Sequence, residues 1–89
     1  ILPANVRGLF ISSELFEVCE FSKLQHLASL ESFEFISGSA AGVVPDGIEG
    51  RWPNLTSFYV INNRFSGRYP RFGPNCSVSL ANNQFYGEI

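Results

Sequence analysis

The sequence predicts an α/β fold in which about four short repeats are stacked into a single domain spanning residues 1–89. Two observations predict this fold. First, residues 55–70 contain an alternating apolar triplet followed by asparagine, glycine and proline at fixed offsets, which suits a short strand and then a sharp bend. Second, the same spacing recurs with starts near residues 6, 30, 55 and 75, and such periods are typical of stacked repeat structures.

The copy that begins at Leu55 defines the spacing. Its characteristic residues are Leu55, Phe58, Val60, Asn63, Phe65, Gly67 and Pro70. The copy before it carries Leu30, Phe33, Phe35, Gly38, Ala40, Gly42, Val44 and Pro45. The last copy carries Val78, Leu80, Asn83, Phe85, Gly87 and Ile89. The first copy is weaker: Leu9, Ile11 and Phe16 fit, but Glu14 replaces the asparagine and Val18 the glycine.

These positions resemble the leucine-rich repeat, and the longer pattern L-x-x-L-x-L-x-x-N-x-L-x-G-x-I-P resembles its plant-type, extracellular subclass. The resemblance covers the chain from Val6 onward and departs at Glu14, Val18, Gly38 and the short repeat of 20 residues. It implies a leucine-rich repeat solenoid, a right-handed β/α superhelix. Such a solenoid has a short-stranded parallel sheet on its concave face and short helical or 3-10 turns on its convex face. The apolar chain ends favour a segment of a longer solenoid, with flanking repeats of the parent chain as neighbours.

Each repeat is expected to contribute one strand, at residues 9–11, 33–35, 58–60 and 78–80. The outer two side chains of each triplet should point inward and the middle one outward. In the bend that follows, buried backbone groups need partners, and Asn63 and Asn83 are predicted to supply them as a structural asparagine ladder. Gly38 and Glu14 cannot do so equally well, so the first half is expected to be looser, by about 1–3 kcal/mol per missing partner.

The segments that return from one repeat to the next are expected to be compact. Apolar residues recur every three positions from Phe21 to Phe33, which predicts a short helix with 3-10 character near residues 22–28, with Ser22 as a candidate N-cap. The next return segment is rich in glycine and carries Trp52, which we expect to fill the core. Residues 71–74 are too few for a helix.

No catalytic residue, metal site or cofactor is expected, so the chain is predicted not to be an enzyme. His26 is the only histidine, and Glu14, Glu17 and Glu20 fit a solvated face better than an acid–base pair. Residues 38–42 lack the Gly-Lys-Ser/Thr that completes a phosphate loop. A net charge of −2 without a basic cluster argues against nucleic acid, and no apolar run is long enough for a transmembrane helix.

The cysteines and two sequons bear on the compartment. Cys19 and Cys76 lie in the first and fourth repeats, about 14 Å apart by strand spacing, so we expect no disulfide between them. Asn54-Leu55-Thr56 and Asn75-Cys76-Ser77 make Asn54 and Asn75 candidate N-glycosylation sites. With the resemblance, they favour an extracellular or cell-surface protein; the chain shows no signal peptide.

The outward positions of the strands supply the candidate binding surface. We predict that a protein or peptide ligand binds there, on the concave face, through Phe10, Glu34, Ile36, Tyr59 and Ile61. Three functions remain open. The favoured one is a non-enzymatic binding module of a receptor-like extracellular domain. The others are a secreted enzyme inhibitor resembling the polygalacturonase-inhibiting repeat proteins, and a structural spacer or fragment without independent activity.

Overall fold

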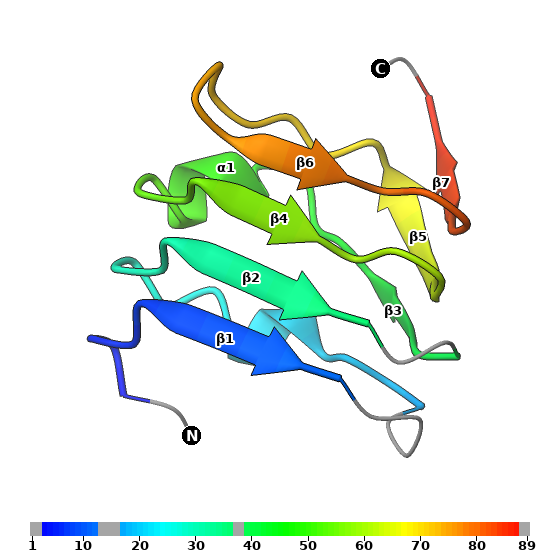
Figure 1. The fold of residues 1–89 in the computed structure, drawn as a ribbon, viewed down its shortest axis with the longest axis horizontal. Coiled ribbons are helices and arrows are strands. Elements are labelled where there is room, and N and C mark those ends of the chain that lie inside the picture. Colours follow the sequence, from blue (N-terminus) through cyan, green and yellow to red (C-terminus); the bar gives the residue numbers. More distant parts are fainter. Residues whose placement is uncertain (1–2, 13–16, 37–38, 88–89) are drawn as a thin grey trace.

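The structure, a computed structural model, describes residues 3–12, 17–36 and 39–87, which form a small α/β-type domain with parallel strands in two sheets (Figure 1). The four-stranded sheet has the order β1 (Gly8–Ile11), β2 (Ser32–Phe35), β4 (Ser57–Tyr59) and β6 (Ser77–Ser79). The three-stranded sheet has the order β3 (Ala41–Val43), β5 (Arg64–Arg68) and β7 (Gln84–Tyr86). The predicted α/β class with short parallel strands is confirmed.

The register of the four-stranded sheet follows the repeat spacing of the sequence. Gly8 pairs with Ser32, Ser32 with Ser57, and Ser57 with Ser77, so equivalent residues of successive repeats are direct neighbours. Each strand begins one residue earlier than expected, and β4 and β6 also end one residue earlier. Figure 1 shows these strands side by side in chain order, from β1 near the N-terminus to β6.

The three-stranded sheet was not predicted, since the residues after each first strand were interpreted as a bend only. Its strands, AGV, RFSGR and QFY, are short and contain glycine or polar residues, so they lack the apolar alternation that identifies a strand. Its register also departs from the repeat. Ala41 pairs with Arg64 and Ser66 with Gln84, which shifts each strand by two residues relative to the repeat spacing of 25 and 20.

The core lies between the two sheets and the return segments, and it is largely aromatic. Phe33 and Phe58 stack across β2 and β4 with ring centroids 5.3 Å apart, and Phe35 meets Phe65 of β5 edge-on at 5.4 Å. Trp52 is 1% exposed, packs 5.2 Å from Phe33, and donates its indole N–H to the Leu24 carbonyl at 3.0 Å. The expectation that Trp52 fills the core is therefore confirmed.

The outer two residues of each predicted triplet are most deeply buried in the middle of the four-stranded sheet. Phe33, Phe35, Phe58 and Val60 are at most 2% exposed. In the outer strands, Leu9, Ile11 and Leu80 are only partly buried, and Val78 is 40% exposed. The difference arises because, among residues 3–12, 17–36 and 39–87, β1 and β6 each pair with a strand on one side only.

Helical structure is limited to two short pieces in the described part of the chain. A 3-10 turn, η1 (Phe21–Lys23), occupies the start of the predicted helix, but the helix does not continue to residue 28. Ser22 lies inside this turn, and the N-cap position belongs to Glu20, whose side chain makes no capping hydrogen bond. The predicted extent and cap were thus wrong. The short α1 (Ile48–Arg51) was not predicted, and it buries Ile48.

The predicted asparagine ladder lies at the corner between the two sheets. Asn63 is 6% exposed, and its Nδ2 donates to the carbonyls of Phe35 at 2.6 Å, Val60 at 3.2 Å and Ile61 at 3.1 Å. Asn83 repeats the arrangement one strand further on, with donation to Val60 at 2.6 Å. Their Oδ1 atoms accept from the amides of Ala40 and Phe65. The structure thus places both asparagines where they bond to backbone groups of their own and the preceding repeat.

The backbone on either side of the ladder takes left-handed conformations. Asn62 and Asn82, each directly before a ladder residue, both have φ of 60°, which asparagine tolerates better than most residues. Asn82 Nδ2 donates to Asn62 Oδ1 at 2.6 Å, so these two side chains also connect neighbouring repeats. Gly67 has φ of 107°, and a Cβ there would lie 2.9 Å from the Val44 carbonyl oxygen. Glu14 and Gly38, which occupy the ladder position in the first two repeats, lie outside the described residues. That the first half of the chain is less stably packed therefore stays a prediction.

The end of the molecule beyond β6 and β7 is open and apolar. A hollow of about 730 Å³ there is lined chiefly by Tyr69, Pro70, Phe72, Val78, Leu80 and Phe85. In the described part of the chain, β6 and β7 are edge strands, each paired with another strand on one side. Apolar side chains next to a free strand edge favour association with another chain.

We expect Asn63→Ala to lower the free energy of unfolding by at least about 2 kcal/mol, because it removes the hydrogen bonds that Asn63 makes with buried carbonyls and with the Ala40 amide. Asn83→Ala is the matched comparison, and its loss should be smaller because Asn83 lies partly exposed near the open end. Urea unfolding followed by circular dichroism measures both. Equal losses, or no loss at Asn63, would contradict the assigned role.

We expect the 89-residue chain to self-associate reversibly and Val78→Lys to shift it toward the monomer, because a lysine at this edge adds charge where Val78 is 40% exposed. Sedimentation equilibrium at several concentrations measures this. Ser22→Lys adds the same charge on the exposed turn η1 and should leave association unchanged. A wild-type chain that stays monomeric at every concentration would refute the expectation.

Candidate functional site

The candidate site is the solvent-facing side of the four-stranded sheet, here called the outer face. It consists of the side chains that alternate with the buried ones, in three rows that cross β1, β2, β4 and β6. The first row is Gly8, Ser32, Ser57 and Ser77. The second is Phe10, Glu34, Tyr59 and Ser79. The third, one step beyond the paired residues, is Ser12, Ile36, Ile61 and Ala81.

All five predicted binding residues lie on the outer face. Phe10, Glu34 and Tyr59 are direct neighbours in the register of β1, β2 and β4. Ile36 and Ile61 occupy the next row, where the Ile36 amide donates to the Ile11 carbonyl at 2.8 Å and so keeps the strands aligned past the sheet's end. The structure therefore brings together residues that are up to 51 positions apart in the sequence.

The exposure of these residues sets the outer face apart from the core. Phe10 is 63% exposed and Ile36 is 38% exposed, whereas Tyr59, Ile61 and Glu34 are half-buried. Large apolar side chains that share one uncovered sheet face are typical of surfaces that bind partners. To a partner this face offers apolar area, the Tyr59 hydroxyl and the Glu34 carboxylate.

Sequence reasoning missed the first row of the outer face. Ser32, Ser57 and Ser77 stand in register beside the aromatic row, and with Gly8 they form a row of small residues. The space above Gly8 is taken by the Phe10 ring, since a Cβ at Gly8 would lie 2.7 Å from Phe10 Cε2. This row could have been found by extending the alternation of inward and outward residues in each strand by one residue toward the N-terminus. The strand predictions began one position too late to include it.

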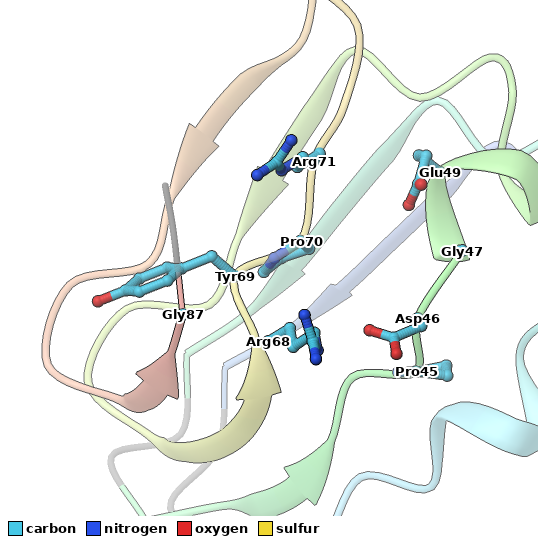
Figure 2. Close-up of a pocket in the computed structure, with 9 residues that line it drawn as sticks. All are labelled: Pro45, Asp46, Gly47, Glu49, Arg68, Tyr69, Pro70, Arg71 and Gly87. Atoms are coloured by element: carbon cyan, nitrogen blue, oxygen red, sulfur yellow. The ribbon is translucent and has the colours of Figure 1, made fainter.

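A second, polar hollow of about 510 Å³ lies away from the outer face, between the segment before α1 and the end of β5 (Figure 2). Its charged residues are Asp46, Glu49, Arg68 and Arg71. In Figure 2 the Asp46 carboxylate and the Arg68 guanidinium point toward one another across the opening, and the Tyr69 ring points away from it. All four charged residues are exposed, and their charges balance, so the hollow has no excess of either sign with which to attract an ion.

The residues considered as catalytic candidates and placed by the structure lie on exposed segments. His26 is exposed on the segment after η1, and Glu17 and Glu20 are exposed as expected of a solvated face. Glu14 and Gly38, which complete two of the patterns considered, lie outside the described residues. Within residues 3–12, 17–36 and 39–87, no group of three or more His, Cys, Asp or Glu side chains could hold a metal ion.

The two cysteines are not paired, as predicted. Cys19 is 6% exposed, and burial raises the pKa of its thiol to about 12, with a further contribution from the neighbouring Glu20 carboxylate. Burial also raises the pKa of the half-buried Cys76 thiol. Because the thiolate is the reactive form, neither cysteine is an activated nucleophile.

Both candidate glycosylation sites are exposed and lie just before strands, Asn54 before β4 and Asn75 before β6. Asn54 Nδ2 donates to the Ala28 carbonyl at 3.4 Å, and the Thr56 hydroxyl donates to the Glu31 carbonyl at 3.0 Å. Asn54 and Asn75 line the same shallow hollow, on the side where the return segments enter the sheet. A glycan at either residue would therefore leave the outer face open.

A scan against protein-family models and searches of curated proteins and of solved structures found no match. Among the described residues, no helix has both the length and the apolar character needed to cross a membrane.

We expect the unfolding free energy to fall as pH rises above about 8.5, the ordinary thiol pKa. In that range the unfolded chain releases the Cys19 proton, whereas the folded chain holds it until about pH 12. The contribution of this one proton is at most about 1.4 kcal/mol per pH unit. Chemical denaturation at pH 8 to 10.5 measures it, with Cys19→Ala as the control. Parallel pH profiles for the two proteins would contradict the assignment.

Proposed function

We propose that the chain is a non-enzymatic protein- or peptide-binding module of the leucine-rich repeat kind, and that the outer face is its binding surface. The observation that carries the proposal is the row of uncovered aromatic and aliphatic side chains in register across β1, β2 and β4. In this proposal the outer face is the concave face of a solenoid, and the module belongs to a receptor-like extracellular or cell-surface protein.

Three features support the solenoid. The strands of each sheet follow one another in chain order, and the chain alternates between the two sheets from β2 to β7. The register of the four-stranded sheet equals the repeat spacing. Asn63 and Asn83 make the same hydrogen bonds in successive repeats, each to its own turn and to the one before. A coil that advances by one strand spacing per turn would produce all three.

The chemistry of the outer face supports binding over catalysis. Aromatic residues are enriched in protein interfaces, and Tyr59 combines a large apolar ring with a hydroxyl at its tip. The serines of the first row offer hydrogen-bonding groups beside this apolar row. An extended segment that runs parallel to the strands would cross the three rows and meet small polar, aromatic and aliphatic side chains in order.

The extracellular part of the proposal is supported by the exposed sequons at Asn54 and Asn75 and by the resemblance of the repeats to the plant-type subclass. Glycans at these residues would leave a binding surface on the outer face accessible. Both features concern the compartment, and the binding proposal does not depend on them.

We expect the double substitution Tyr59→Ser and Ile61→Ser to weaken binding of peptides selected on the wild-type chain by at least about tenfold, because it removes apolar area from the centre of the outer face. The peptides would come from a phage-displayed random dodecapeptide library, and fluorescence anisotropy would measure their affinities.

The matched control is Val43→Ser, which removes an apolar side chain that is 65% exposed on the other sheet. Binding should survive this change, and circular dichroism should show both variants folded. If every selected peptide tolerated the double substitution, the outer face would not be the binding surface.

A further inference from the structure

We infer that the outer face selects a peptide segment that carries an arginine or lysine side chain. In this inference the Glu34 carboxylate binds the cation, at a position between Phe10 and Tyr59. The inference rests on the proposed function and adds the chemical class of the ligand. Apolar residues that flank the cation in the segment would contact Ile36 and Ile61.

The register places the carboxylate between two aromatic side chains. Phe10 pairs with Glu34, and Glu34 pairs with Tyr59, so the three occupy one row on adjacent strands. Adjacent strands lie about 4.8 Å apart, so Phe10 and Tyr59 flank Glu34 at a distance of one strand on either side. A guanidinium or ammonium there could form a charge-assisted hydrogen bond with Glu34 while a ring face contacts it.

Glu34 is the only charged residue among the twelve positions of the outer face. The ion pairs found among the described residues lie elsewhere: Arg7 with Glu31 at 3.9 Å, and Lys23 with Glu20 at 3.3 Å. Arg64, in β5, donates its Nε to the Ser39 carbonyl at 2.9 Å. The outer face therefore holds one negative charge without a cation beside it in its rows.

When a ligand covers the outer face, the charge of Glu34 determines which ligands bind favourably. Any segment that packs on Phe10, Tyr59 and Ile61 must remove water from the half-buried Glu34 carboxylate. Removing water from an unpaired charge is unfavourable, whereas a ligand cation replaces the lost hydration. Selection thus works twice, by attraction of basic segments and by a penalty on segments that leave Glu34 unpaired.

The planar guanidinium fits this arrangement better than the ammonium. It can donate two hydrogen bonds to one carboxylate and can also stack on an aromatic ring. Arginine is therefore expected more often than lysine at the selected position.

The test is selection of a phage-displayed random dodecapeptide library on three immobilised 89-residue chains: wild type, Glu34→Gln and Glu31→Gln. Glu31→Gln is the matched control, because it removes the same charge from an exposed residue just before β2 that is not on the outer face. Circular dichroism would check that all three are folded. The best wild-type peptide would then be synthesised with arginine and with citrulline, its neutral isostere, at the basic position.

We expect peptides selected on the wild type and on Glu31→Gln to share one arginine or lysine position, and those selected on Glu34→Gln to lack it. Replacing arginine with citrulline should weaken binding at least about tenfold to the wild type and less than about threefold to Glu34→Gln.

Two results would overturn the inference and leave the proposed function standing. One is a set of peptides that depend on Tyr59 and Ile61 but share no basic position. The other is that Glu31→Gln and Glu34→Gln change the selected peptides equally. That result would indicate that the net charge of the chain, and not a binding site at Glu34, selects basic peptides. If no selected peptide depends on Tyr59 and Ile61, the proposed function fails, and this inference fails with it.

Discussion

The hydrogen bonds of Asn63 and Asn83 are the constraint on which the rest of the structure depends. At the corner between the two sheets the chain leaves one hydrogen-bonded ladder before it enters the next, so its carbonyls and amides need other partners. Asn63 Nδ2 serves three carbonyls, from two successive repeats, and its Oδ1 accepts from the Ala40 amide. An asparagine amide offers donors and an acceptor together, which aliphatic, hydroxyl or carboxylate side chains cannot match in the same space.

This corner connects the core to the outer face. Because each asparagine ties its own repeat to the preceding one, the strands cannot slide past one another without breaking these bonds. A fixed register then stacks Phe33 on Phe58 inside the molecule. On the other side of the same strands it aligns Glu34 with Tyr59. The buried polar contacts thus decide which side chains are neighbours on the surface that we propose for binding.

Residues with a strong local signal were predictable from the sequence, and those that depend on neighbouring chain segments were not. The triplets around Phe33 and Phe58 and the spacing of Asn63 and Asn83 predicted the four-stranded sheet, the ladder and the alignment of the outer face. The second sheet was missed, because β3, β5 and β7 are held by pairing across repeats and carry little apolar alternation of their own. The helix expected at residues 22–28 is limited to η1, because the apolar spacing in the sequence indicated where it begins but not how long it is.

The most direct test of the account is amide hydrogen exchange at Ala40 and Phe65, measured by NMR in the wild type and in Asn83→Ala. Both amides donate to asparagine side chains, Ala40 to Asn63 and Phe65 to Asn83. The account predicts that both exchange slowly in the wild type, and that Asn83→Ala accelerates exchange at Phe65 much more than at Ala40. Unchanged protection of Phe65 in the variant would contradict the role of the asparagines at the corner between the sheets.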